Sequence, residues 1–138
     1  MWPFRPDKKL GRRGEKLAAR ALRRKGMKLL ATNYRCPSGE IDIIALDKST
    51  RRNSGRETIV FVEVKTRSDD AYNTPESAVN APKRRRIRKA ARYYLSHHPT
   101  DGYGVRYDIV AIVAPEDAKP RIKHIAGAFT SNRDPEAL

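Results

Sequence analysis

The stretch of sequence that decides the fold of this 138-residue chain is Val60-Phe61-Val62-Glu63-Val64-Lys65-Thr66. Its β-branched and aromatic residues predict a buried strand, because such side chains pack well on a pleated sheet. Both faces of the stretch are largely apolar, so we expect a central strand that is covered on both sides. Strand side chains alternate between faces, which places Glu63 and Lys65 on one face and the valines on the other.

A second stretch, Gly39-Glu40-Ile41-Asp42-Ile43-Ile44-Ala45, also carries charge within an apolar run. A buried charge costs several kcal/mol unless it is paired or binds a metal. Alternation places Asp42 on the face of Glu40 and Ile44, opposite its two isoleucine neighbours. If the two strands pair, Asp42 meets Glu63 and Lys65 at one edge of the sheet. Two carboxylates beside a lysine predict a small divalent-metal site with a base or charge stabiliser next to it.

The order of these motifs resembles a known nuclease signature. Gly39-Glu40-x-Asp42 followed by Glu63-x-Lys65 is similar to the active-site pattern of the PD-(D/E)XK nuclease superfamily, although Glu40 stands where the superfamily often has proline. Over roughly residues 11–126 the chain resembles the small bacterial YraN family, which is similar in fold to archaeal Holliday-junction resolvases. Further motifs carry this resemblance: helix residue Glu15, Tyr34-Arg35-x-x-x-Gly39, Phe61-Val62-Glu63-Val64-Lys65-Thr66-Arg67, the basic helix after Pro82, and Arg106-Tyr107-Asp108-Ile109-Val110.

The resemblance implies a restriction-endonuclease-like α/β fold in three layers, with a mixed central sheet of about five strands flanked by helices. The implied activity is that of a Mg²⁺- or Mn²⁺-dependent endonuclease acting on DNA, with branched or structured DNA among the substrates. Asp42, Glu63 and the backbone carbonyl of Val64 would hold the metal. Lys65 would orient the attacking water or stabilise the phosphorane. Resolvase-like relatives cut as symmetric pairs, which leaves a homodimer open.

Two residues keep alternative interpretations. Glu15 lies at the border of the apolar face of its helix, where it either pairs with a neighbouring base or reaches the edge of the site, as the corresponding helix glutamate does in resolvase-like nucleases. Lys83 lies over the apolar stripe of the second long helix, four residues before Ile87. It is either a snorkelling surface lysine or a phosphate contact at the rim of the site. For Asp108, in an apolar strand beside Arg106, we favour a structural role.

The chain carries 30 Lys and Arg against 16 Asp and Glu, a net charge of +14 with a pI near 10.3. This balance indicates a polyanionic partner, DNA before RNA, bound without reading its sequence. A solvated cationic surface is the simpler alternative. A non-catalytic nucleic-acid-binding protein with a nuclease-like fold, or an adaptor on the ribosome or a DNA-processing complex, would use the same charge. The residues that we expect to contact nucleic acid are Arg67, Lys83, Arg84, Arg85, Arg86 and Arg88.

The chain is long enough for one domain, at residues 10–126, between a flexible basic arm at 1–9 and a disordered tail at 127–138. Polar loops are expected at Lys48–Arg56 and Ser68–Pro75, both mobile. The remaining expected elements are a helix at Leu10–Lys25 ended by Gly26, strands at Lys28–Arg35, Glu40–Asp47 and Glu57–Lys65, a helix with Asn80 as cap and Pro82 in its first turn, and strands at Val105–Val113 and Arg121–Ile125.

Two features that the sequence lacks, a pair of cysteines and a long apolar stretch, indicate the compartment of the protein. Cys36 is the only cysteine, so no intramolecular disulfide forms and a reducing environment is indicated. No stretch approaches the roughly 20 apolar residues of a membrane span. These features predict a soluble, cytoplasmic protein that does not bind membranes.

Overall fold

Five strands form one mixed sheet in the order β1-β2-β3-β4-β5 in the computed structural model, which describes residues 8–67, 79–115 and 117–132. The β2–β1 and β2–β3 pairs are antiparallel, β3–β4 is parallel, and β4–β5 is antiparallel. The elements in chain order are α1 (Lys8–Arg24), β1 (Lys28–Cys36), β2 (Gly39–Asp47), a 3₁₀ turn η1 (Lys48–Thr50), α2 (Arg51–Ser54), β3 (Thr58–Arg67), α3 (Ala81–His97), β4 (Gly104–Val113) and β5 (Arg121–Phe129).

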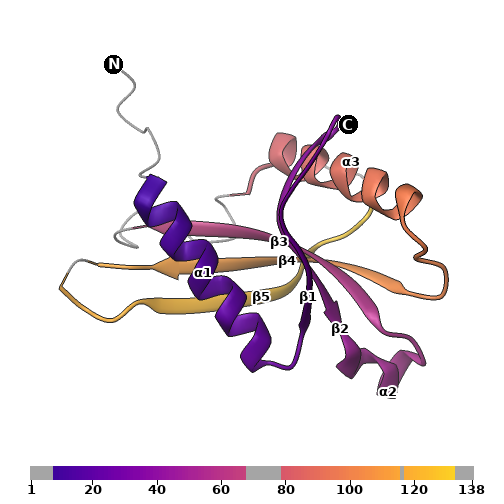
Figure 1. Cartoon of the computed structure of the whole chain (residues 1–138), viewed down its shortest axis with the longest axis horizontal. Helices are drawn as coiled ribbons and strands as arrows, with labels where there is room; N and C mark the ends of the chain where they lie inside the picture. The colour runs from indigo at the N-terminus through magenta and orange to yellow at the C-terminus, as the bar shows by residue number, and fades with distance from the viewer. Residues whose placement is uncertain (1–7, 68–78, 116, 133–138) are drawn as a thin grey trace.

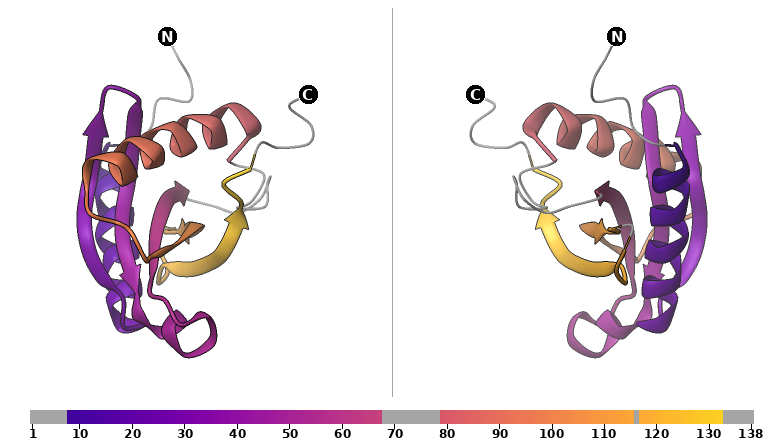
Figure 2. Two further views of the ribbon diagram at one scale, coloured as in Figure 1. Left: turned by 90° about the vertical axis from the view of Figure 1, so that its right-hand side faces the viewer. Right: turned by 90° about the vertical axis from the view of Figure 1, so that its left-hand side faces the viewer.

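Helices α1 and α3 lie on opposite faces of the sheet, which gives three layers (Figures 1 and 2). The parallel β3–β4 pair needs a crossover connection, and α3 belongs to it. Strand β3 is central, as its two apolar faces predicted. The predicted three-layer α/β fold with a mixed five-stranded sheet is confirmed.

The side chains of β3 alternate between two cores. Ile59 and Phe61 pack on the α3 side, and Val60 and Val62 pack on the α1 side. All four are at most 3% exposed. Burying an aliphatic or aromatic side chain of this size stabilises the fold by roughly 1.5–3 kcal/mol. The side chain of Glu63 therefore projects from β3 on the α3 side, directly after the last apolar residue of that face, Phe61.

Both long helices have the ends that their sequences predicted. Gly26, at φ 88°, ends α1, and the Met27 N–H donates to the Leu22 carbonyl at 3.1 Å. At α3, the Asn80 side chain accepts a hydrogen bond from the Lys83 N–H at 3.1 Å, with Pro82 in the first turn. The cap holds the backbone of Lys83 in the first turn of α3.

Two predicted boundaries differ most from the structure, and others, such as the start of α1 at Lys8 inside the predicted arm 1–9, differ by one or two residues. The predicted loop Lys48–Arg56 contains η1 and α2, because Asp47 accepts a hydrogen bond from the Ser49 N–H at 3.0 Å and Gly55, at φ 75°, ends the turn. Strand β5 continues past Ile125 to Phe129, into the predicted tail, because the Phe129 ring stacks on Tyr107 with centroids 4.9 Å apart. The Ser68–Pro75 loop and the start of the basic arm lie outside the described residues.

Candidate functional site

The candidate site begins where β2 and β3 part. Their ladder ends at the pair Ile43 and Val62. Continuing this register would place Ile41 opposite Val64, but the Val64 N–H donates instead to Asp42 Oδ2 at 2.8 Å. A side-chain carboxylate thus replaces the neighbouring strand as hydrogen-bond partner. The predicted meeting of Asp42 with the Glu63–Lys65 segment is present in the structure.

The strict alternation predicted around Asp42 is wrong. Ile41 packs in the α3-side core, whereas Ile43 packs in the α1-side core, although alternation would place both on one face. On β1, Thr32 pairs with Ile43 and Tyr34 pairs with Ile41, so Asn33 lies opposite Asp42 without being paired in the ladder. Asn33 has a φ of 49°. Asparagine tolerates this left-handed conformation better than most residues. The alternation of side chains along β2 is therefore interrupted at Asp42, between a residue on the α3 side and a residue on the α1 side.

Glu63 is the buried acid of the site, only 6% exposed. Its Oε1 lies 3.2 Å from Lys83 Nζ. Burial, and then the charge of Asp42, raise the pKa of Glu63 to about 7, while Lys83 and Lys65 oppose that rise. At neutral pH this carboxyl group therefore populates both its protonated and its ionised form, whereas an ordinary surface glutamate is ionised.

Lys83 is ion-paired with an acid on the sheet, which argues against a merely snorkelling surface lysine. Its phosphate contact at the rim of the site stays a prediction. The first turn of α3, capped by Asn80, directs its ammonium group at Glu63. Sequence reasoning missed this pair. The available signal was that Lys83 shares the apolar stripe with Ile87, and that Glu63 lies on the β3 face which this stripe covers.

Glu15 reaches the site because α1 approaches the end of β3 closely. A Cβ at Gly14 would overlap the side chain of Thr66. Burial, and then the charge of Asp42, raise the pKa of Glu15, and a hydrogen bond with the Asn33 side chain opposes the rise. Of its two interpretations, this geometry agrees with the one at the edge of the site.

The other predicted site residues lie along β3. Lys65 is half-buried on the same face as Glu63, and its charge lowers the pKa of that acid. Val64 lies between them and is bonded to Asp42 through its N–H. Arg67 is the last residue of the strand, where its carbonyl accepts a hydrogen bond from the Ala114 N–H at 2.8 Å.

The basic residues predicted on α3 divide into two groups. Arg85 and Arg86 are exposed, as expected for nucleic-acid contacts. Arg84 is half-buried, and its Nη1 donates to the Val79 carbonyl at 2.9 Å. Arg88, in contrast, is only 3% exposed. Its flank of the helix faces the end of β5, which covers it.

A divalent ion is compatible with this donor set. In the described part of the chain, no three His, Cys, Asp or Glu side chains converge as a metal-binding group. Mg²⁺ keeps several waters and commonly takes only one or two protein carboxylates. Asp42 and Glu63, with the backbone carbonyl of Val64 as a further oxygen, would meet that smaller requirement. Burial, and then the charge of Asp42, outweigh Lys83 and Lys65 and leave the pKa of Glu63 raised.

Comparison with known proteins places the chain in a family. Residues 14–112 match the model of the uncharacterised protein family UPF0102. A UPF0102 protein from Geotalea daltonii is 43% identical over 123 residues, covering 89% of this chain and 91% of the relative. Another, from Solibacter usitatus, is 46% identical over 121 residues, covering 86% and 84%. The chain belongs to the UPF0102 family.

The UPF0102 family is the YraN family that the sequence motifs resemble, so that prediction is confirmed. The matched span includes Glu15, Asp42, Glu63, Lys65 and Lys83, and thus every side chain of the acidic site described above. Among the described helices of this UPF0102 protein, none is long and apolar enough to cross a membrane.

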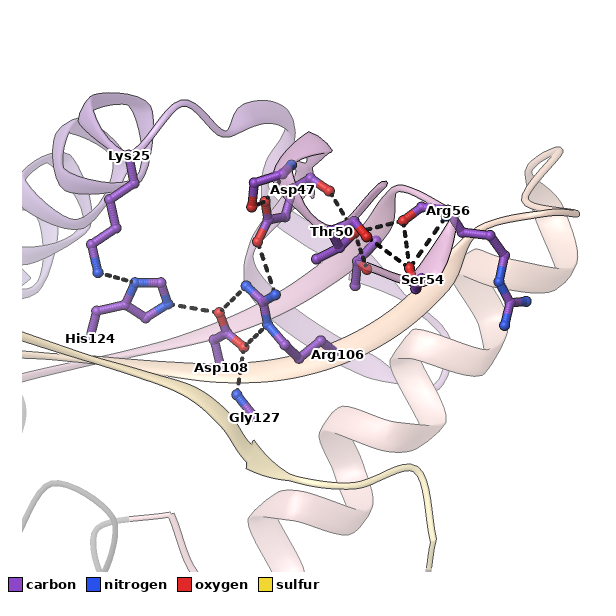
Figure 3. Close-up of polar contacts among 11 residues, drawn as sticks. Lys25, Asp47, Thr50, Ser54, Arg56, Arg106, Asp108, His124 and Gly127 are labelled. Carbon is purple, nitrogen blue, oxygen red and sulfur yellow. Dashed lines mark hydrogen bonds and ion pairs between the residues drawn. The ribbon is translucent and has the colours of Figure 1, made fainter. Parts of the chain in front are cut away.

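A second charged cluster in the UPF0102 protein is centred on Asp108 (Figure 3). Asp108, which is completely buried, accepts hydrogen bonds from Arg106 Nε at 2.8 Å and from the Gly127 N–H at 3.0 Å. Arg106 Nη1 also donates to Asp47 at 2.9 Å. Burial raises the pKa of Asp108, but the hydrogen bonds outweigh it and leave the pKa below its usual range. This environment agrees with the predicted structural role.

His124 completes that cluster. Its Nε2 lies 2.7 Å from Asp108 Oδ2, and its Nδ1 lies 2.7 Å from Lys25 Nζ. A charged lysine ammonium can only donate, so Nδ1 of His124 accepts this hydrogen bond. The proton of the ring is then on Nε2, which donates a hydrogen bond to Asp108. These contacts connect the end of α1 to β4 and β5, and such a connection stabilises the fold.

Proposed function

We propose that this UPF0102 protein is a metal-dependent endonuclease that hydrolyses phosphodiester bonds of DNA, with branched or structured DNA as its substrate class. The observation that carries the proposal is the hydrogen bond of 2.8 Å from the Val64 N–H to Asp42, at the point where β2 and β3 part. It brings a carboxylate against the backbone beside Glu63. The fold, a three-layer α/β arrangement, supports the same function by analogy alone.

The charge balance of the site supports a bound cation. Burial, and then the charge of Asp42, raise the pKa of both Glu63 and Glu15, so Asp42 acts on both of the other carboxylates. Lys83 and Lys65 offset this charge in part. Perturbed acids that converge in this way are typical of functional sites. A divalent ion would favour the ionised form of Glu63 at neutral pH.

Each residue has a role in this proposal. Asp42, Glu63 and the Val64 carbonyl would hold a Mg²⁺ or Mn²⁺ ion, which supplies a charge sink and lowers the pKa of bound water. Lys65 orients the attacking water or stabilises the transition-state charge. Lys83, held by the capped turn of α3, favours the ionised form of Glu63. Glu15 adds negative charge beside Asp42.

Basic surfaces would hold the DNA backbone. On α1, the exposed bases follow one side of the helix, and on α3 they follow the side away from the sheet. Phosphate contacts of this kind give affinity that falls with salt and varies little with sequence. The exposed members are Arg12, Arg13, Lys16, Arg20, Arg23 and Arg24 on α1, and Arg85, Arg86, Lys89 and Arg92 on α3.

A passive nucleic-acid-binding protein is the second candidate, and two observations favour it. Glu63 already has a cation 3.2 Å away, in Lys83. In the described residues, no buried side-chain nitrogen or oxygen lacks a hydrogen-bond partner. The same residues would then form an ion-pair network that stabilises the fold, and the basic helices would bind DNA without cutting it.

One experiment distinguishes the two candidates. Purified protein is incubated with Mg²⁺ or Mn²⁺ and with duplex, single-stranded, flap and four-way DNA. Asp42→Asn, Glu63→Gln and Lys65→Ala should each abolish cleavage and keep DNA affinity, and the exposed Asp101→Asn serves as matched control. The nuclease proposal fails if no DNA form is cut with either ion while the site variants melt well below the control.

A further inference from the structure

Two histidine rings stack on tyrosine rings at the C-terminal end of α3. The ring centroids of Tyr93 and His97 are 3.9 Å apart, and those of Tyr94 and His98 are 4.0 Å apart. Tyr94 belongs to the core between α3 and the sheet, so its pair faces the sheet. Tyr93 is only half-buried and His97 is exposed, so this other pair presents aromatic surface to solvent.

The ring of His97 is held in a fixed orientation. Its Nδ1 lies 2.8 Å from the carbonyl oxygen of Tyr93, which can only accept a hydrogen bond, so Nδ1 carries a proton and donates it. The planes of the two rings differ by 15°. One face of the His97 ring thus lies against Tyr93, and the other face is open. A flat ring that is held in this way loses little freedom when a second flat ring stacks on it.

This pair lies on the flank of α3 that starts at the candidate site. At about 100° per residue, four side chains of α3 fall within about 80° of one another around the helix. They are Lys83, Arg86, Tyr93 and His97. Lys83 contacts Glu63, and the exposed Arg86 follows it on the way to the aromatic pair. Figure 2 shows the C-terminal end of α3 beside β1 and β2.

The spacing along this flank suits one nucleic-acid strand. At roughly 1.5 Å per residue, α3 rises by about 21 Å from Lys83 to His97. One strand of B-form DNA advances by about 3.4 Å per nucleotide, so about six nucleotides cover that rise, and fewer do so in a stretched strand. A strand whose phosphate lies at the candidate site therefore reaches the aromatic pair.

Proteins hold single-stranded nucleic acid by combining cationic side chains along the backbone with aromatic rings under the bases. A base in the interior of a duplex has both faces covered by its neighbours, so only an unpaired base can lie on His97. We propose that the outer face of His97, backed by Tyr93, is a stacking platform for an unpaired nucleobase of a strand that follows α3. The choice of a nucleobase rests on the proposed function, and it narrows the substrate class to DNA with a single-stranded segment.

The test uses the whole protein without divalent ion. His97→Gln removes the outer ring, and His97→Phe keeps a ring without the imidazole nitrogens. The matched control is His98→Gln, which removes the neighbouring exposed ring from the pair that faces the sheet. One probe is a single strand that carries 2-aminopurine between abasic residues, so that quenching of its fluorescence reports stacking on the protein. Affinity is measured for an ordinary single strand and for a duplex of the same length.

Wild type and the His98→Gln control should quench the 2-aminopurine. His97→Gln should lose this quenching and bind the single strand about fivefold more weakly or worse, which is the loss expected for one stacked base. Its affinity for the duplex should not change, because the bases of a duplex are not available for stacking. His97→Phe should behave as wild type does.

Three results would overturn the inference. The first is quenching that is the same in His97→Gln and wild type. The second is a His97→Phe variant that behaves as His97→Gln does, since this would assign the imidazole to a polar contact with the backbone of the strand. The third is an equal loss of affinity for single strand and duplex, or an equal loss in His98→Gln, since either would assign the effect to the end of the helix.

Cleavage is measured separately on the same DNA with Mg²⁺ and Mn²⁺, so the two proposals fail independently. If no DNA is cut but the fluorescence and affinity results hold, the stacking platform stands and the nuclease proposal fails. If DNA is cut but wild type does not quench the 2-aminopurine, the nuclease proposal stands and the platform is wrong.

Discussion

Lys83 Nζ lies 3.2 Å from Glu63 Oε1, which connects the capped first turn of α3 to the only buried acid on the α3 face of β3 in the described chain. The pair sets the charge state of the candidate site. Its lysine lowers the pKa of Glu63, and burial and Asp42 raise it. The position of α3 and the protonation state of Glu63 therefore depend on each other.

Replacing Lys83 with methionine should raise the pKa of Glu63 above its present value of about 7, because a charge and a hydrogen bond that favour the carboxylate are lost. Titration of the Glu63 carboxyl carbon by NMR measures this directly. Lys83→Arg keeps the charge and is the control. A Glu63 pKa that is the same in Lys83→Met and wild type would contradict the pairing.

The stability of the protein should depend on the ionisation of Glu63. Its folded-state pKa of about 7 lies above the ordinary value of 4.5, so the folded state binds more protons between these pH values. Stability then falls as the pH rises through this window. Glu63→Gln cannot ionise, so its melting temperature relative to wild type should rise from pH 4.5 to pH 7.5. A difference that stays constant with pH would exclude this account.

The close approach of α1 to β3 should depend on glycine at position 14. Gly14→Ala places a Cβ against Thr66 and should destabilise the fold by roughly 1–3 kcal/mol. Gly11→Ala, on the same helix, meets nothing within 4 Å and should stabilise it by about 0.5–1 kcal/mol. Chemical denaturation of both variants makes the comparison. Equal stability in the two would show that α1 does not pack as described.

The left-handed conformation of Asn33 should matter more than its side chain for stability. Asn33→Gly keeps the backbone at φ 49° without strain, whereas Asn33→Val should cost about 1–2 kcal/mol. Both variants remove the hydrogen bond that lowers the pKa of Glu15, so that pKa should rise equally in both. Unfolding experiments and a carboxyl titration by NMR check the two effects separately. If valine is tolerated as well as glycine, residue 33 does not need the left-handed conformation.

The features that local sequence determines were predictable. The cap at Asn80, the left-handed Gly26 and the central position of β3 each follow from residue type and pattern. The helical turn before Gly55 was missed, although Asp47 and Gly55 are ordinary start and stop signals. Polar composition concealed it, because no apolar stripe marks so short a turn.

The features that depend on packing between distant elements were not predictable. The Lys83–Glu63 pair requires knowing how far along the sheet α3 begins, which periodicity does not state. Burial of Arg88 depends on β5 reaching Phe129, whose ring lies under the guanidinium group. Asparagine at position 33 permits a left-handed residue without requiring one. The change of strand phase at Asp42 therefore appears only in the structure.

The central claim is that Asp42 and Glu63 hold a divalent ion, and Mn²⁺ binding measured by electron paramagnetic resonance of the free ion tests it most directly. Wild type should bind a single Mn²⁺ that Mg²⁺ displaces, and Asp101→Asn should do the same. Asp42→Asn and Glu63→Gln, which keep an oxygen acceptor and remove the charge, should each lose this binding. Equal Mn²⁺ binding by all four proteins, or none by wild type, would contradict the claim.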